Sequence, residues 1–265
     1  MTKLIEQMIA CELKRFVACD YRGRADAPEF EVVPGTVPVM VSAPHAVTHW
    51  RAGRIKPSDD YTGSLALALA QLTGAHAIVA TRFAQADPNW VPFGQSAYKQ
   101  ALVEHVRAHG IRLVLDLHGI PAASPEAVEV GSADGATVCA LPGADARAAA
   151  ILCEELAPFL TRHGKEVALN GRHAARGHNT VANTVARTCG CAALQIELNS
   201  RFRVPSGEGG HVPKGEPIPF RPGQLPEEFE ARHHPDVACV EATMRALARV
   251  IRELAPERQA QGPPR

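Results

Sequence analysis

Apolar runs of strand length alternate along the chain with longer segments whose apolar positions recur at helical spacing. The short runs predict strands over 29–33, 39–42, 76–81, 112–117, 137–141 and 192–198. The longer patterns predict a helix or irregular arm over 4–18 and helices over 58–72, 95–109, 145–163 and 236–254, with a break or kink at Pro158. This alternation is typical of an α/β domain. We therefore expect a mostly parallel or mixed central sheet flanked by helices, in a single domain over residues 1–256.

Two stretches fall outside the alternating pattern. Residues 203–226 are rich in proline and glycine without periodicity, which predicts a long loop. Loops of this length are often functional, and lids over active sites are one common case. Residues 257–265 are polar and are expected to be a disordered tail.

Three of the expected strands carry a side chain suited to a metal site. His45 follows the run Val-Met-Val-Ser-Ala-Pro, His118 closes Leu-Val-Leu-Asp-Leu-His, and Glu197 lies within Ala-Leu-Gln-Ile-Glu-Leu-Asn. An acidic pair, Asp59-Asp60, follows His45. Open α/β sheets bind ligands at the carboxyl ends of their strands, so these residues are expected to share one site. Two imidazoles, one carboxylate ligand and a spare glutamate are the components of a hydrolytic zinc centre.

The histidines and the acidic pair also have structural explanations. A histidine at a sheet edge is often simply satisfied by hydrogen bonds, and carboxylates favour the first turn of a helix, here one capped by Ser58. Neighbouring helical positions diverge by ~100°, so only one of Asp59 and Asp60 should face the crevice. The residues alone leave that choice open.

Asp116 and Glu197 have other expected roles. Asp116 lies two residues before His118, on the same face of a strand, where it could orient the imidazole, bind metal directly, or form an ion pair. Glu197 lies in an apolar strand, where a carboxylate is costly to bury unless it is paired, ligating or catalytic. Desolvation suits a catalytic base by raising its pKa, whereas the structural alternative is a buried ion pair with Arg201 or Arg203.

Composition and charge exclude several kinds of partner. Lys+Arg and Asp+Glu balance at 28 each, so no net charge favours nucleic acid or an anionic membrane. No apolar run is long enough to span a bilayer, and the first residues do not resemble a signal peptide. The 7 cysteines are odd in number and dispersed, which fits reduced thiols in a cytoplasm. We expect a cytoplasmic protein with a small-molecule substrate; the oligomeric state stays open.

Five short motifs follow one another over roughly residues 37–203. They are Pro44-His45, Asp60-Tyr61, Arg82 with Asp87-Pro88-Asn89, Asp116-Leu117-His118-Gly119 and Gln195-Ile196-Glu197-Leu198-Asn199. In this order they resemble the N-formylglutamate amidohydrolase family, which is similar in architecture to the zinc carboxypeptidases and the aspartoacylase-type deacylases. The resemblance implies a zinc-carboxypeptidase-like fold and a zinc ion bound by His45, Asp60 and His118. It further implies that Glu197 is the catalytic base and that Arg82 and Asn89 face the substrate.

One position departs from the family's pattern. The family commonly has Asp-x-Asn-Arg, whose arginine grips a substrate carboxylate, but Trp90 occupies the fourth position here. An indole cannot replace a charged two-pronged clamp. Either the substrate is altered, which we favour, or another arginine supplies the clamp, the candidates being Arg172, Arg176 and Arg201. Trp90 itself would be a substrate contact or a packing residue on a loop.

The predicted function is zinc-dependent hydrolysis of an amide bond in an N-formyl or N-acyl amino acid-like substrate. Zinc would polarise the carbonyl, and Glu197 would carry a proton from the attacking water to the departing amine. Arg82 or His178 would stabilise the oxyanion, although His178 could equally be an ordinary surface-loop histidine. Two alternatives stay open: a carboxypeptidase-like peptidase on the same metal centre, and a non-catalytic metal-binding or ligand-binding relative.

Overall fold

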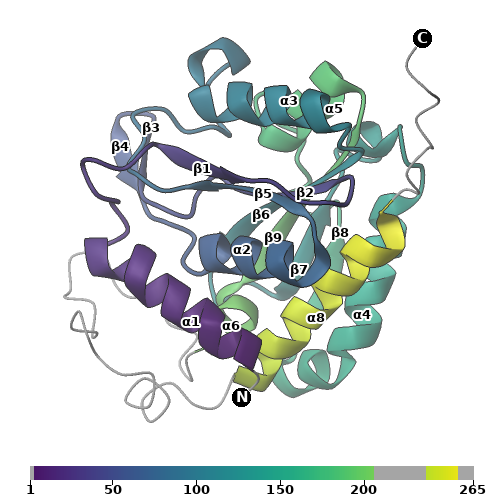
Figure 1. Ribbon diagram of the computed structural model, residues 1–265. Coiled ribbons are helices and arrows are strands. Elements are labelled where there is room, and N and C mark those ends of the chain that lie inside the picture. The colour runs from purple at the N-terminus through teal and green to yellow at the C-terminus, as the bar shows by residue number, and fades with distance from the viewer. Residues whose placement is uncertain (1–2, 206–236, 256–265) are drawn as a thin grey trace.

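A seven-stranded sheet with helices on both faces forms the centre of the molecule (Figure 1). This is a computed structural model, and it describes residues 3–205 and 237–255. The sheet order is β1-β5-β2-β6-β9-β7-β8. The strands are β1 (Phe30–Val33), β2 (Val39–Ala43), β5 (His76–Ala80), β6 (Leu113–Ile120), β7 (Glu126–Gly131), β8 (Glu166–Leu169) and β9 (Ala192–Asn199). The predicted α/β class and mixed, mostly parallel sheet are confirmed.

Helices α3 and α5 cover one face of the sheet, and α1, α2, α4 and α8 cover the other (Figure 1). The helices are α1 (Lys3–Arg15), α2 (Thr62–Thr73), α3 (Ala97–His109), α4 (Ala144–His163), α5 (Val181–Cys189), α6 (Ser200–Arg203) and α8 (Val237–Leu254). Amphipathic α8 packs on α4, and its side chains on the buried face, such as Leu247 and Val250, are fully buried. Each such side chain contributes about 1.5–3 kcal/mol of burial free energy. Among the described residues, no helix has the length and apolar character required to cross a membrane.

The three central strands of the sheet, β2, β6 and β9, lie side by side and end together. β2 pairs with β6, and β6 pairs with β9, both in parallel. His118 on β6 lies opposite Glu197 on β9, and His45 follows the end of β2. Parallel neighbours end at the same edge of a sheet, so the two imidazoles and the carboxylate come together there, as predicted.

The predicted helix over 58–72 begins later, at Thr62. Tyr61 has a left-handed backbone with a φ of 67°, and its N–H donates to the buried carboxylate of Glu12. A right-handed helix cannot pass through that conformation without cost, so Asp59 and Asp60 lie on the loop before it. The late start of the helix therefore sets the direction of both aspartates.

Other elements differ from the expectation. The predicted strand over 137–141 is wrong: after left-handed residues at Ala133, Asp134 and Gly135, the chain forms a 3-10 helix, Ala136–Val138. Strand β7 comes earlier and contains the buried Glu129, whose polarity hid the strand pattern. Helix α4 runs through Pro158 without the predicted break. A further hairpin, β3 (His49–Arg51) with β4 (Arg54–Lys56), was not predicted. The predicted tail, and all but the start of the predicted loop over 203–226, lie outside the described residues.

Candidate active site

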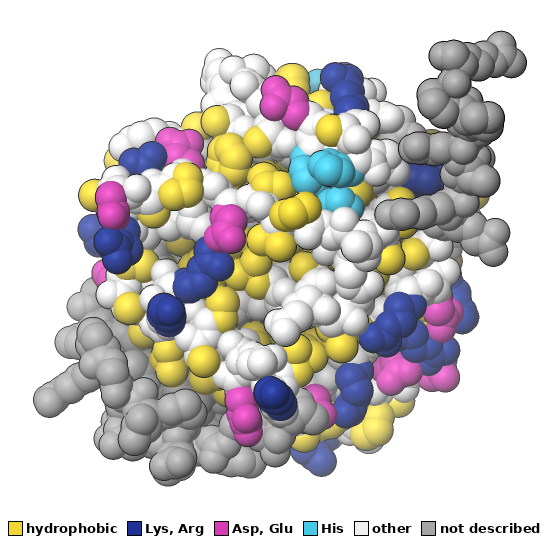
Figure 2. Space-filling view, viewed as in Figure 1, with side chains coloured by type: hydrophobic (Ala, Val, Ile, Leu, Met, Phe, Trp, Pro, Cys, Tyr) yellow, Lys and Arg dark blue, Asp and Glu magenta, His cyan; other side chains and the backbone are white. Residues whose placement is uncertain are grey.

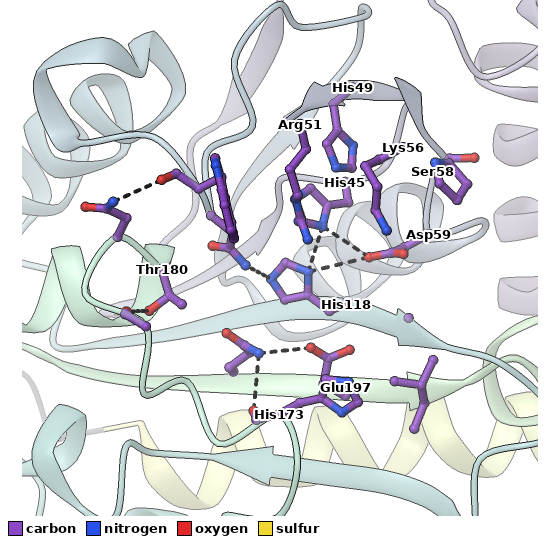
Figure 3. Close-up of a pocket in the computed structure, with 18 of the residues that line it drawn as sticks. His45, His49, Arg51, Lys56, Ser58, Asp59, His118, His173, Thr180 and Glu197 are labelled. Carbon is purple, nitrogen blue, oxygen red and sulfur yellow. Dashed lines mark hydrogen bonds and ion pairs between the residues drawn. The ribbon is translucent and has the colours of Figure 1, made fainter. Parts of the chain in front are cut away.

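A pocket of about 860 Å³ opens where β2, β6 and β9 end. Its lining includes His45, His118 and Glu197, the side chains expected to share a site. In Figure 3, side chains from the β3–β4 hairpin face those of β6 and β9 across this space. The sequence therefore predicted the position of the pocket. It did not predict the β3–β4 hairpin that faces β6 and β9 across it.

Three possible ligand atoms converge inside the pocket. Nδ1 of His45 lies 3.0 Å from Nδ1 of His118, and Oδ2 of Asp59 lies 3.4 Å and 3.5 Å from these two nitrogens. The ligand atoms of these three residues all lie within 4.8 Å of one another. Two imidazoles and one carboxylate are a common protein ligand set for zinc.

A carboxylate lies behind each imidazole. Nε2 of His45 is 2.8 Å from Oδ1 of Asp87, and Nε2 of His118 is 2.9 Å from Oδ2 of Asp116. The side-chain amide nitrogen of Asn89, a donor, also lies 3.0 Å from Nε2 of His118, but the hydrogen bond to the charged carboxylate is the stronger of the two. Each carboxylate thus places a proton on Nε2 and leaves the Nδ1 lone pair facing the shared centre. Asp116 therefore takes the orienting role considered for it.

Two imidazole lone pairs and a carboxylate oxygen face the same point, so a positive charge between them is favourable. Burial alone lowers the pKa of His118, but Asp116 and Asp59 outweigh it and raise the pKa well above its ordinary value. Burial raises the pKa of Asp59, but hydrogen bonds from His118 and His45 reverse this and lower it. Both shifts have the same meaning: the two imidazoles and the carboxylate favour a positive charge between them. His45, Asp59 and His118 fit a divalent metal on these grounds.

Asp59 joins this group, and Asp60, which the family resemblance favoured, does not. The Asp59 N–H donates to the carbonyl of His45 at 2.7 Å, which brings the aspartate beside the imidazoles. The carboxylate of Asp60 accepts a hydrogen bond from the Ser58 hydroxyl at 2.6 Å. The predicted helical geometry, in which the two aspartates diverge on a first turn, does not apply because both precede α2.

The glycine of the Asp-Leu-His-Gly motif has a steric explanation. The carbonyl of Asp60 accepts a hydrogen bond from Nε of the buried Arg203 at 2.9 Å. The same guanidinium group lies on Gly119, where an added Cβ would come within 2.6 Å of it. Any side chain at Gly119 would displace Arg203 and disturb the loop that carries the aspartates.

Glu197 is buried at the edge of the candidate metal group. Its side chain accepts a hydrogen bond from Nε2 of Gln195 at 2.9 Å. In the described part of the chain neither Arg201 nor Arg203 forms an ion pair with it, which removes the structural alternative. Burial is the main cause of its raised pKa, although His118 opposes the shift. A partly desolvated carboxylate beside two imidazoles can accept and release a proton.

Some of the residues expected to contact the substrate line the pocket. Asn89, Trp90 and His178 do so, and the Trp90 side chain is 56% exposed. Asn89 is held by the N–H of Val181, which donates to its side-chain oxygen at 2.7 Å. His178 is exposed and lies against Arg187.

The predicted arginines are not among the lining residues. Arg82 lies beside β1, with its guanidinium near Glu29 and the carbonyl of Ala25. This position follows from the sheet order, in which β5 lies one strand farther out than β2. Arg176 forms an ion pair with Asp134, and neither Arg172 nor Arg201 lines the pocket. None of these four arginines is placed to bind a substrate in the pocket.

The hairpin supplies charged groups that the sequence analysis missed. Arg51 and Lys56 both line the pocket, and the Arg51 guanidinium carbon lies 5.8 Å from the centroid of the Trp90 ring. Nε of Arg51 contacts Asp87, which leaves the two terminal nitrogens outside that contact. His49 stacks on His45 with ring centroids 4.1 Å apart. No local signal marks these residues, because only the folded hairpin turns them toward β6.

Comparison with known proteins places this architecture among solved structures. The chain matches no protein-family model and no curated protein sequence. An N-formylglutamate amidohydrolase from Ralstonia eutropha JMP134 is similar in structure, with a TM-score of 0.55 and 16% identity over 86% of this chain and 98% of that chain. A bacteriophage poly-gamma-glutamate hydrolase has a TM-score of 0.46 at 14% identity over 87% of this chain and 92% of that chain.

A metallo-carboxypeptidase from Pseudomonas aeruginosa has a TM-score of 0.40 at 13% identity over 88% of this chain and 60% of that chain. At these identities the similarity establishes the fold alone. The chain thus has an α/β fold with a candidate metal centre at the carboxyl ends of its strands. More particularly, it has the fold of the Ralstonia N-formylglutamate amidohydrolase, as the motifs implied.

Proposed function

We propose that the protein is a zinc-dependent amidohydrolase that cleaves the amide bond of an N-formyl or N-acyl amino acid. The observation that carries the proposal is the convergence of two Nδ1 lone pairs and one carboxylate, each imidazole being backed by a further carboxylate. Glu197 lies buried beside this group, in a pocket large enough for a small molecule. A hydrolase fold among the structural neighbours agrees with the assignment.

His45, Asp59 and His118 would hold the ion. When bound, zinc would polarise the amide carbonyl and lower the pKa of a water molecule toward ~7. Glu197 would take the proton from the attacking water as the new carbon–oxygen bond forms. It would then deliver that proton to the nitrogen as the carbon–nitrogen bond breaks, so that the carboxylate is regenerated.

We further assign the substrate's negative group to the hairpin. Arg51 takes the place of the missing arginine clamp, since its guanidinium lies over the Trp90 ring and lines the pocket. Lys56 adds a second positive charge on the same side (Figure 3). An acyl amino acid with a free carboxylate would meet these charges while its amide faces Glu197. The acidic substrate class would then be retained despite Trp90.

Glu197→Gln tests the catalytic assignment. The amide keeps the volume of the carboxylate but cannot accept the proton, so kcat should fall by roughly 10²–10⁴-fold. Purified wild-type and variant proteins would be assayed on a panel of N-formyl amino acids, N-acetyl amino acids and peptides, with bound zinc measured by elemental analysis. Zinc content should stay near that of the wild type in Glu197→Gln and fall in the matched variant His118→Gln.

Two outcomes would contradict the proposal. One is full activity in Glu197→Gln, and the other is undiminished turnover by wild-type protein from which all metal has been removed. Zinc binding without hydrolysis of any member of the panel would indicate the non-catalytic alternative. Turnover of peptides alone would indicate the peptidase.

A further inference from the structure

Three histidines form a second cluster away from the pocket. His105 and His109 are four residues apart on α3, and His76 begins β5. Nδ1 of His76 lies 2.8 Å from Nε2 of His105, and the His105 and His109 ring centroids are 4.1 Å apart. One nitrogen from each ring lies within 4.8 Å of the other two. Figure 2 shows histidine side chains gathered in one place on the molecular surface.

The cluster lies at the amino-terminal ends of the parallel strands, whereas the candidate active site lies at their carboxyl ends. β5 runs parallel to β2, and His76 pairs with Met40 near the start of that strand. His45 follows the other end of β2. None of the three clustered histidines lines the pocket. Binding at this cluster can therefore be separated from binding at the candidate active site.

Three imidazoles are the type of ligand that zinc, copper and nickel ions prefer. Residues at i and i+4 on a helix lie on one face, a spacing that metal-binding helices use for pairs of histidines. Imidazole suits zinc, copper and nickel, whereas magnesium and calcium require oxygen ligands. Around a tetrahedral zinc, with zinc–nitrogen bonds of about 2.0–2.1 Å, ligand nitrogens lie roughly 3.3 Å apart. The 2.8 Å separation between Nδ1 of His76 and Nε2 of His105 is close to that spacing, and one nitrogen of His109 lies within 4.8 Å of both residues' ligand atoms.

Burial is graded across the three histidines. His76 is buried, His105 is half-buried and His109 is exposed. The rings of His76 and His105 are already confined by burial, so fixing them around an ion would cost little further side-chain entropy. His109 is exposed, so an ion could enter the cluster from solvent on its side. Water would complete the coordination on the exposed side.

We propose that His76, His105 and His109 form a second site for a divalent transition metal of the zinc class, independent of the candidate active site. A bound ion would join the C-terminal end of α3 to the start of β5. This proposal does not depend on the proposed hydrolase function.

His109→Ala tests the site because this side chain is exposed and its loss leaves the core intact. Metal-free wild type and His109→Ala would be titrated with zinc against a chromophoric chelator. The variant should lose about one bound equivalent and weaken zinc affinity at the cluster by at least tenfold. The control is His163→Ala, since His163 also ends a helix before a left-handed glycine and belongs to no such cluster in the described part of the chain; its ring packs on Phe202, so the folding of both variants is compared by thermal unfolding. The chain contains 12 histidines, so the difference between variants rather than the total is diagnostic.

A combined variant separates the two sites. His118→Gln should remove one equivalent, and His118→Gln with His109→Ala should remove two. Amide hydrolysis by the zinc-loaded His109→Ala protein should stay within twofold of wild type. If wild type and His109→Ala bind the same number of equivalents with the same affinity, the proposal is wrong. Equal losses in His109→Ala and His163→Ala would also overturn it, because the effect would then be nonspecific.

Discussion

The two histidine clusters differ in what lies behind their imidazoles. His45 and His118 are buried, and each has a carboxylate on the ring nitrogen that faces away from the shared centre. His105 and His109 form no ion pair with an aspartate or glutamate among the described residues. The pKa of His118 is raised by its carboxylate neighbours, whereas the pKa of His105 is lowered by burial and then by His109. The same residue type thus forms a buried centre that favours a cation in one place and an open cluster in the other.

The contrast shows that carboxylates decide the character of an imidazole site. A carboxylate fixes the tautomer, aims the lone pair and raises the basicity of the ligand. The candidate active site has these supports, so it should bind metal tightly. The surface cluster lacks them at His105 and His109, so it should bind more weakly and exchange more easily.

The largest effect on stability is expected at Glu12, a buried carboxylate that forms no hydrogen bond or ion pair with an imidazole among the described residues. It accepts hydrogen bonds from the Tyr21 hydroxyl and the Tyr61 N–H, and burial raises its pKa from 4.5 to about 7. Between these values the folded state holds a proton that the unfolded state releases, so stability falls as pH rises through 7. At pH 8 the loss approaches roughly 3 kcal/mol.

Glu12→Gln should recover that stability, because glutamine keeps the acceptor oxygen and carries no charge. The variant should exceed wild type by up to about 3 kcal/mol at pH 8, and the gap should close near pH 4.5. Denaturant unfolding across this pH range measures the difference. Glu6→Gln, at an exposed position of the same helix, provides the control. A gap that does not change with pH would refute the explanation.

Asp116→Asn tests the carboxylate support directly. The amide keeps the shape but loses the charge behind His118, so zinc affinity at the candidate active site should fall by roughly 10–100-fold. Zinc bound at the surface cluster should be unchanged, which provides an internal control within one titration. The metal-free proteins would be compared by thermal unfolding to separate binding from folding. If affinity falls equally at both sites, the carboxylates do not account for the contrast.

The smallest effect is expected at Arg51. Its side chain is 27% exposed, so water screens the charge, and Arg51→Leu should lower kcat/KM for acyl amino acids with a free carboxylate by roughly tenfold. The corresponding amides, which lack that charge, should be affected much less. Arg54→Leu is the matched control because Arg54 pairs with Arg51 across the hairpin and does not line the pocket. Equal effects on charged and neutral substrates would exclude the assigned clamp.

Much of the candidate active site could be predicted because its residues sit on apolar strands. The runs ending in His45 and His118, and the one containing Glu197, have few conformational alternatives, and parallel strands bring their ends to one edge. The residues alone left the choice between Asp59 and Asp60 open for a physical reason. It depended on the left-handed Tyr61, whose N–H is held by Glu12 from a helix 49 residues away. No local pattern reports such a distant hydrogen bond.

The sequence by itself determined the α/β class, the positions of the strands that carry the site, and the grouping of two imidazoles with a buried glutamate. These follow from apolar periodicity, which acts over a few residues and is imposed by the geometry of each element. Only the tertiary structure decided that Asp59 joins the imidazoles, that Arg51 rather than Arg82 reaches the pocket, and that His76 meets His105 and His109. Each of these depends on the contact of segments far apart in the chain, and such contacts are fixed by packing and hydrogen bonding across the whole fold.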